Sequence, residues 1–144
     1  MNKAVGGFTL IELVVVISIL GILAAFAFPR FVSLEAGTRT TAVQELGDSI
    51  RSTSALAHAL SLAQGNPATV TMEGQTITMA NAYPNEATIN NTLIDISGFT
   101  YTDTAGGATF TKNGAATPAS CGVTYVESAN ADAPPTITVD TSAC

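Results

Sequence analysis

Basic side chains are scarce in this chain of 144 residues, which has five lysine and arginine residues against eleven aspartate and glutamate residues. Charged residues of both signs make up only 11% of the sequence, and the formal net charge is -6. Proteins that bind nucleic acids usually present a basic surface to the phosphate backbone, and this composition cannot supply one. We therefore expect no nucleic-acid partner and an acidic, soluble exterior.

Histidine occurs once, at His58, so a metal site built on several histidines is excluded. This residue lies in the segment ALAHAL, beside the apolar stripe of an expected helix, and no Ser-His-Asp or Cys-His spacing surrounds it. We interpret His58 as a helix-face or interface residue, with a pH-sensitive contact as the alternative. The sequence predicts neither an enzyme nor a bound cofactor.

Carboxylates in the second half of the chain are scattered and lack the dense alternation of a calcium-binding loop. We interpret them as solvated surface charges, with calcium at one site as the alternative. No metal site is predicted from them. The set consists of Asp95, Asp103, Glu127, Asp132 and Asp140.

Cysteine occurs twice, at Cys121 and Cys144, and the two do not form a C-x-x-C pair. This spacing argues against a zinc site and against thioredoxin-like chemistry. A disulfide is the simplest interpretation, because it would close a loop of about 24 residues and stabilise the tail by roughly 3 kcal/mol in an oxidising compartment. It would also require the C-terminal part to lie outside the cytoplasm. Two unpaired buried thiols are the alternative.

A long apolar run begins near the start of the chain, from Phe8 to Phe28, and contains one ionisable side chain, Glu12. As a helix it would extend about 31 Å, which matches a hydrocarbon thickness of roughly 30 Å. An ordinary secretory leader has small residues after its apolar stretch, whereas here the pair Gly6-Gly7 precedes it. We therefore expect the apolar segment to be retained after cleavage.

Cleavage between Gly7 and Phe8 would create a free amine at Phe8, four residues before Glu12. A carboxylate in an apolar membrane helix is unfavourable by up to about 2.5 to 3.5 kcal/mol at mid-bilayer, so a compensating charge is expected. The Phe8 amine could supply it within one helix or between neighbouring chains. The alternative is a plain signal anchor with a tolerated acidic residue.

The segment GFTLIEL, followed by the apolar run, resembles the type IV prepilin signature of a short basic leader, Gly before the cut, Phe after it and Glu at the fifth mature position. Gly7, Phe8 and Glu12 match this pattern. The resemblance implies that a prepilin peptidase cuts after Gly7 and N-methylates Phe8, and that Glu12 meets the Phe8 amine of an adjacent subunit. Gly21 and Pro29 fall where pilins carry helix-weakening residues.

The fold expected from this pattern is α+β, with a leader at 1–7, an apolar membrane and assembly helix at 8–29, and a head at 30–144. Pro29 is expected to bend the helix without ending it. Beyond Pro29, apolar positions spaced by three and four predict an amphipathic helix over 30–64 that packs on an antiparallel sheet. The stripe consists of Val43, Leu46, Ile50, Thr53, Ala57 and Leu60.

Residues 65–144 shift to threonine, alanine, asparagine and glycine with alternating patterns, which predicts strands. Two hairpins are expected, one around Glu73-Gly74 and one around residues 105–107. Two more candidate strands lie in GVTYVES and PTITVDT. The stretch from Tyr83 to Asp95 is expected to be a loop with a short helical turn.

The tail CGVTYVESANADAPPTITVDTSAC looks like the C-terminal region of the mannose-sensitive haemagglutinin (MSHA) pilins, and FPRFVSL and SALAHA resemble the same branch. This resemblance implies an inner-membrane precursor that an assembly platform and motor build into an extracellular homo-oligomeric pilus for attachment and biofilm formation. A major pseudopilin of a type II secretion system is the alternative. The cysteine pair disfavours it, because major pseudopilins generally lack such a closed tail and depend more on calcium. A monomeric bitopic protein with an extracellular binding head is a second alternative.

Overall fold

The computed structural model describes residues 7–130 and 133–144, apart from the side chains of residues 32 and 33. Most of the expected leader, with Gly6, therefore lies outside the described residues, as does Asp132. The chain forms two compact units, Met1–Ala36 and Gly37–Cys144, and one helix, α1 (Leu10–Ala63), contributes to both. The predicted long N-terminal helix is confirmed, and it continues through Pro29.

The end of α1 follows from local chemistry. Gly65 and Asn66 adopt left-handed conformations with φ of 80° and 59°. The Asn66 amide donates to the Ser61 carbonyl at 2.8 Å and the Gly65 amide donates to the Leu62 carbonyl at 3.2 Å, which is the Schellman arrangement. The predicted stop at Gly65-Asn66-Pro67 is thus confirmed to within one residue.

The C-terminal part of α1 packs through the predicted stripe. Val43, Ile50 and Ala57 are fully buried. Ser54 and Ser61 are also buried, so the buried face is wider than the apolar pattern indicates. These small polar positions were not predicted, because the prediction used mainly the spacing of apolar residues.

A small antiparallel sheet packs beside the end of α1, with strand order β1-β2-β3. Glu73 and Gly74 lie between β1 and β2 with φ of 48° and 77°, which is the type I′ geometry of a two-residue hairpin, as expected for this pair. The short strand β3 was not predicted, whereas the short helical turn η1 (Ile89–Thr92) was. The strands are β1 (Thr69–Met72), β2 (Gln75–Ala80) and β3 (Tyr83–Pro84).

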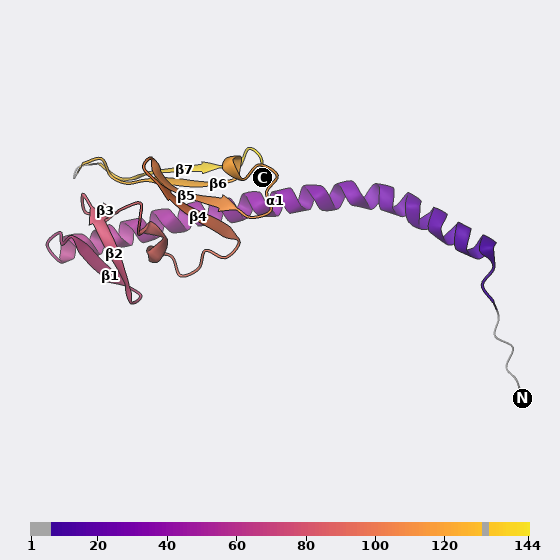
Figure 1. The fold of residues 1–144 in the computed structure, drawn as a ribbon, viewed down its shortest axis with the longest axis horizontal. Helices are drawn as coiled ribbons and strands as arrows, with labels where there is room; N and C mark the ends of the chain where they lie inside the picture. Colours follow the sequence, from indigo (N-terminus) through magenta and orange to yellow (C-terminus); the bar gives the residue numbers. More distant parts are fainter. Residues whose placement is uncertain (1–6, 131–132) are drawn as a thin grey trace, which may run out of the picture. The chain divides into compact units, whose positions relative to one another are not determined.

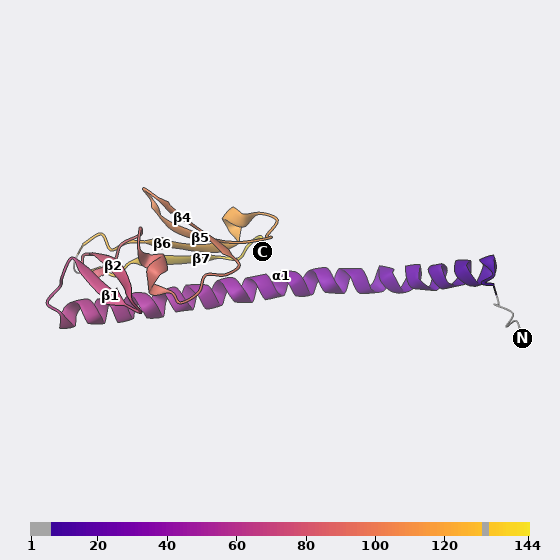
Figure 2. The same ribbon diagram turned by 60° about the horizontal axis from the view of Figure 1, so that its bottom comes forward.

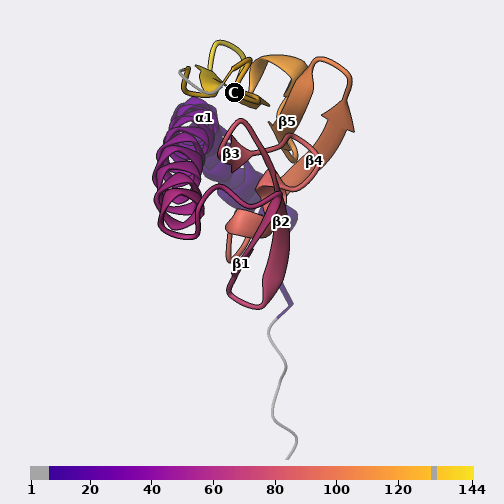
Figure 3. The ribbon, with the colours of Figure 1, turned by 90° about the vertical axis from the view of Figure 1, so that its left-hand side faces the viewer.

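A second antiparallel sheet has the order β4-β5-β6-β7 and covers α1 along the head (Figures 1 and 2). Viewed along the helix, both sheets lie on one side of α1 (Figure 3). Phe110, Val123 and Tyr125 of this sheet are buried in one cluster with Val43 and Ile50 of α1. The α+β fold class is confirmed. The strands are β4 (Phe99–Thr104), β5 (Gly107–Lys112), β6 (Gly122–Val126) and β7 (Thr136–Asp140), with the 3-10 turn η2 (Pro118–Ser120) before β6.

Candidate functional site at the start of the helix

Thr9 and Glu12 cap the N-terminus of α1 reciprocally. The Thr9 amide and hydroxyl both donate to Oε2 of Glu12, at 2.9 and 2.7 Å, and the Glu12 amide donates to Oγ1 of Thr9 at 3.3 Å. This is the capping box T-x-x-E, which satisfies amides that the first helical turn leaves unpaired. A carboxylate in the first turn also interacts favourably with the helix dipole.

Glu12 was expected to meet only the Phe8 amine, within one helix or between neighbouring chains, and its pairing with Thr9 was not predicted. The signal was present in TLIE, where a threonine precedes a glutamate by three residues at the start of an apolar helix. In the intact chain the nitrogen of Phe8 is an amide joined to Gly7, so it carries no charge for Glu12 to meet. A free amine exists there only after the peptide bond between Gly7 and Phe8 is cut.

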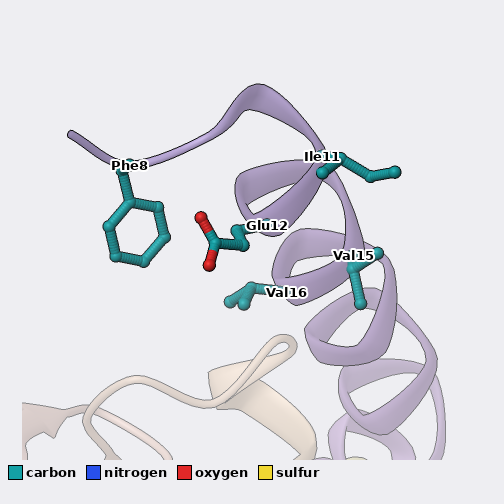
Figure 4. Close-up of a pocket in the computed structure, with 5 residues that line it drawn as sticks. All are labelled: Phe8, Ile11, Glu12, Val15 and Val16. Carbon is teal, nitrogen blue, oxygen red and sulfur yellow. The ribbon is translucent and has the colours of Figure 1, made fainter. Parts of the chain in front are cut away.

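Phe8 and Glu12 line one open hollow of about 310 Å³ on the surface of the first two turns, together with Ile11, Val15 and Val16. Figure 4 shows the Glu12 carboxylate between the Phe8 ring and Val16. Phe8 is 81% exposed, and Ile11 is 71% exposed. The hollow thus combines one carboxylate with apolar walls that nothing in the described chain covers.

The apolar run continues this uncovered surface along α1. Its large side chains are all exposed from Leu10 to Phe31, and the helix is long and apolar enough to cross a membrane by length and composition. A helix that is apolar on all sides is stable only in lipid or inside a larger assembly. This exposed apolar surface lies in the segment for which a role in membrane insertion and assembly is expected.

Gly21 and Pro29 both lie inside this apolar part of α1. A side chain at Gly21 would meet no described atom within 4 Å, so packing within the chain does not require glycine there. Glycine and proline each destabilise a helix interior, by about 1 and about 3 kcal/mol relative to alanine. The apolar part of the helix therefore carries two helix-weakening residues, and packing within the described chain does not account for the glycine at position 21.

Cys121 and Cys144 form a disulfide with 4.8 Å between their Cα atoms. Cys121 is fully buried, and Cys144 packs against the core. The Cys144 carbonyl also accepts a hydrogen bond from Arg39 of α1 at 3.1 Å. Cys144 is therefore held covalently at the residue that precedes β6, and by a charged hydrogen bond to the helix.

His58 contacts the turn between β2 and β3. Its Nδ1 lies 2.9 Å from the Ala82 carbonyl oxygen, and its ring stacks on Tyr83 with 4.0 Å between centroids. Ala82 has φ of 66°, a left-handed conformation that is unfavourable for alanine. His58 thus holds a strained turn against α1, which agrees with the predicted helix-face role. Among the described residues, no three of histidine, cysteine, aspartate or glutamate are placed to hold a metal ion.

Comparison with known families gives a match at the start of the chain. Residues 2–28 match the family model of the prokaryotic N-terminal methylation motif, which is the signature of type IV pilins and pseudopilins. The matched residues include the expected cut, Glu12 and the apolar run. The motif points to a structural protein that is processed by prepilin peptidase and assembled into a filament. No curated protein and no solved structure matches the chain.

Proposed function

We propose that this chain, which carries the N-terminal methylation motif of type IV pilins and pseudopilins, is an MSHA-like pilin. In this proposal it is inserted in the inner membrane, cut after Gly7, methylated at Phe8 and polymerised through 8–29 into a surface filament. The filament serves adhesion and biofilm formation. The observation that carries the proposal is the coincidence of the methylation motif with a helix whose apolar side chains are exposed on all sides.

The route from membrane to filament follows from where this apolar surface can be stable. In the bilayer, lipid covers it, and apolar attraction between helices is weak because lipid tails are equally apolar. Outside the bilayer, the same surface must be covered by copies of itself, since water contact is costly. Extraction of the subunit is therefore favourable only if the helix enters a bundle at once. This agrees with the assembly platform and motor that the family resemblance implies.

Glu12 can set how far neighbouring helices of this bundle are shifted along their axes. Its carboxylate already faces the N-terminal end of α1, where maturation creates the Phe8 amine. A charge pair in an apolar surrounding is favourable only at close range, and an unpaired charge there is costly. Pairing of Glu12 with the Phe8 amine of the next subunit would therefore fix the axial stagger between neighbours, while apolar contacts alone would permit many staggers.

A pseudopilin of a type II secretion system shares the N-terminal motif. Features of the head are therefore needed to distinguish a pilin from a pseudopilin. The disulfide between Cys121 and Cys144 supports the pilin, because the family resemblance associates this closed tail with pilins rather than with major pseudopilins. The disulfide also supports a head outside the cytoplasm, since such bonds persist in oxidising compartments.

The experiment that tests the proposal combines intact mass and electron microscopy of material sheared from cells. We expect filaments built from a chain that lacks residues 1–7, carries one methyl group and retains the disulfide. Gly7→Leu should leave the leader attached and prevent filaments, whereas Gly37→Leu is a control at an uncrowded glycine in the same helix. Absence of filaments together with a secretion defect would favour the pseudopilin, and a mature protein without the apolar helix would exclude both.

A further inference from the structure

The outer face of the four-stranded sheet is built mostly from threonine. Thr102, Thr109, Thr124 and Thr138 are direct neighbours across all four strands in the register of the sheet. Thr100 and Thr111 form the next row, and these six residues define the threonine face. Alternate residues of the same strands point into the core, so the face lies opposite to α1.

This face differs in charge from the rest of the head. Residues 37–144 carry nine acidic and three basic side chains, so two heads that approach each other are repelled over most of their surfaces. Along the strand positions that share the outer side of the sheet with the threonine face, the charged side chain is that of Asp140. It lies at one corner of the sheet. Two copies can therefore come into contact at this face with little repulsion.

The shape of the face also fits a second copy. Gly122 follows Thr111 in its row, and a hollow of about 190 Å³ lies at this point, bordered by Thr109, Thr124 and Asp140. A small β-branched side chain from a facing sheet could enter this hollow. Two right-twisted sheets pack face to face at about −30° with about 10 Å between them, and threonine is a favoured residue in strands.

The area decides what kind of association this face can support. Four strands about 4.8 Å apart and about five residues long give roughly 300 Å² per copy. A stable pair of proteins buries about 800 Å² on each partner, so one pair of heads would separate readily. Two parallel filaments, in contrast, repeat the contact along their whole length, and linked weak contacts add to a strong one.

We propose that the threonine face joins two filaments side by side, each copy contacting the same face of a second copy in the neighbouring filament. This inference rests on the proposed function, because only a polymer repeats the contact often enough. A filament whose core consists of copies of α1 leaves this face on its outside, since α1 covers the other side of the sheet. Salt should promote bundling by screening the acidic heads, because the Debye length falls to about 10 Å at 0.1 M.

The test compares bundling of sheared filaments by electron microscopy and low-speed sedimentation at low and raised salt. We expect wild-type filaments to bundle at raised salt and Thr138→Lys filaments to remain single. Lysine lowers the net negative charge of the head, so general repulsion cannot explain the loss. Thr71→Lys places the same change on an exposed position of β1 and should bundle normally. Thr138→Val keeps the β-branched shape and should retain bundling.

Thr102→Lys, on the other edge of the sheet, replaces Thr138→Lys if that variant does not fold, as judged by thermal unfolding. Bundling of both lysine variants at the wild-type level would overturn the inference. Wild-type filaments that stay single at every salt concentration would overturn it as well, without affecting the proposed function. Lysine variants that bundle but no longer attach to a polysaccharide-coated surface would assign the face to attachment instead. A chain that forms no filaments contradicts the proposed function itself.

Discussion

The Thr9 hydroxyl and the Glu12 carboxylate lie 2.7 Å apart, and each residue also accepts the backbone amide of the other. Before assembly, the glutamate is therefore held by its own helix end and is not an isolated charge. A partner amine in a filament has to compete with this local arrangement. Because the carboxylate has several acceptor positions, it can keep one Thr9 bond while it binds an amine.

Glu12→Ala should leave membrane insertion intact or improved, since it removes a charge from an apolar helix. Filament yield should fall strongly, because the proposed interchain pair is lost. The measurement is the amount of the chain in sheared filaments relative to the amount in membranes.

Glu12→Gln retains a capping side chain without charge, and Thr9→Ala removes the cap at a cost of about 1 kcal/mol. We expect Glu12→Gln to assemble poorly and Thr9→Ala to assemble. Normal filament yield from Glu12→Ala would count decisively against interchain pairing.

Gly47→Ala should destabilise the head, although alanine is the better helix former. A Cβ at position 47 would lie 2.6 Å from Cγ2 of Val139 on β7, a stiff β-branched side chain. Overpacking of this kind costs about 1 to 3 kcal/mol, against a helix gain of about 1 kcal/mol. Gly37→Ala is the matched control, since its Cβ would meet no described atom within 4 Å. Urea unfolding of the detergent-solubilised chain should show opposite signs for the two variants.

The stability of the head should fall at alkaline pH. Burial raises the pKa of Tyr125 to about 12, and its phenol donates to the Pro84 carbonyl at 2.6 Å. The unfolded tyrosine ionises near pH 10, so this contribution is complete below pH 10 and is lost as the pH rises toward 12. The expected loss is about 2 kcal/mol across that window.

Tyr125→Phe provides the control for this pH effect. It should be less stable at pH 8 by about 1 to 3 kcal/mol, because the Pro84 carbonyl loses its buried donor. Its unfolding free energy should then depend less on pH between 10 and 12. Burial also raises the pKa of Tyr101, which leaves a smaller slope of the same sign in the variant. A variant with the full wild-type slope would assign the effect to another group.

Removal of the disulfide by the double change Cys121→Ser and Cys144→Ser should lower the unfolding free energy by roughly 3 kcal/mol, because the unfolded chain gains the freedom of an open loop. Arg39→Gln leaves the disulfide in place and weakens the hydrogen bond to the Cys144 carbonyl. It should cost about 1 kcal/mol. Thermal unfolding by circular dichroism checks both. If both variants lost the same unfolding free energy, the stabilisation would come from the charged hydrogen bond and not from the disulfide.

Local patterns in the sequence were sufficient for most elements of the fold. The stripe through Val43 and Ile50 predicted the packed face of α1, and alternating threonines around Glu73-Gly74 predicted β1 and β2. These signals are local, because one helix face or one hairpin determines them. The strand β3 was missed because it has only two residues, which is too short for any periodic signal.

Other features depend on contacts between distant segments and have no local signal. The close approach of Gly47 to Val139 and the stacking of His58 on Tyr83 arise only after the sheet has packed on α1. Gly47 interrupts a good helix pattern, which is the one clue that something lies close to it. The division of the strands into two sheets likewise depends on tertiary packing.

The closed loop from Cys121 to Cys144 bears on how the chain withstands proteolysis. Any protease that cuts the chain once between these two cysteines leaves both pieces covalently joined through sulfur. A nicked chain would gain only the mass of one water, and its two fragments would separate only after treatment with a thiol reductant. The connection between β6 and β7, which follows the end of β6 at Val126, lies inside this protected loop.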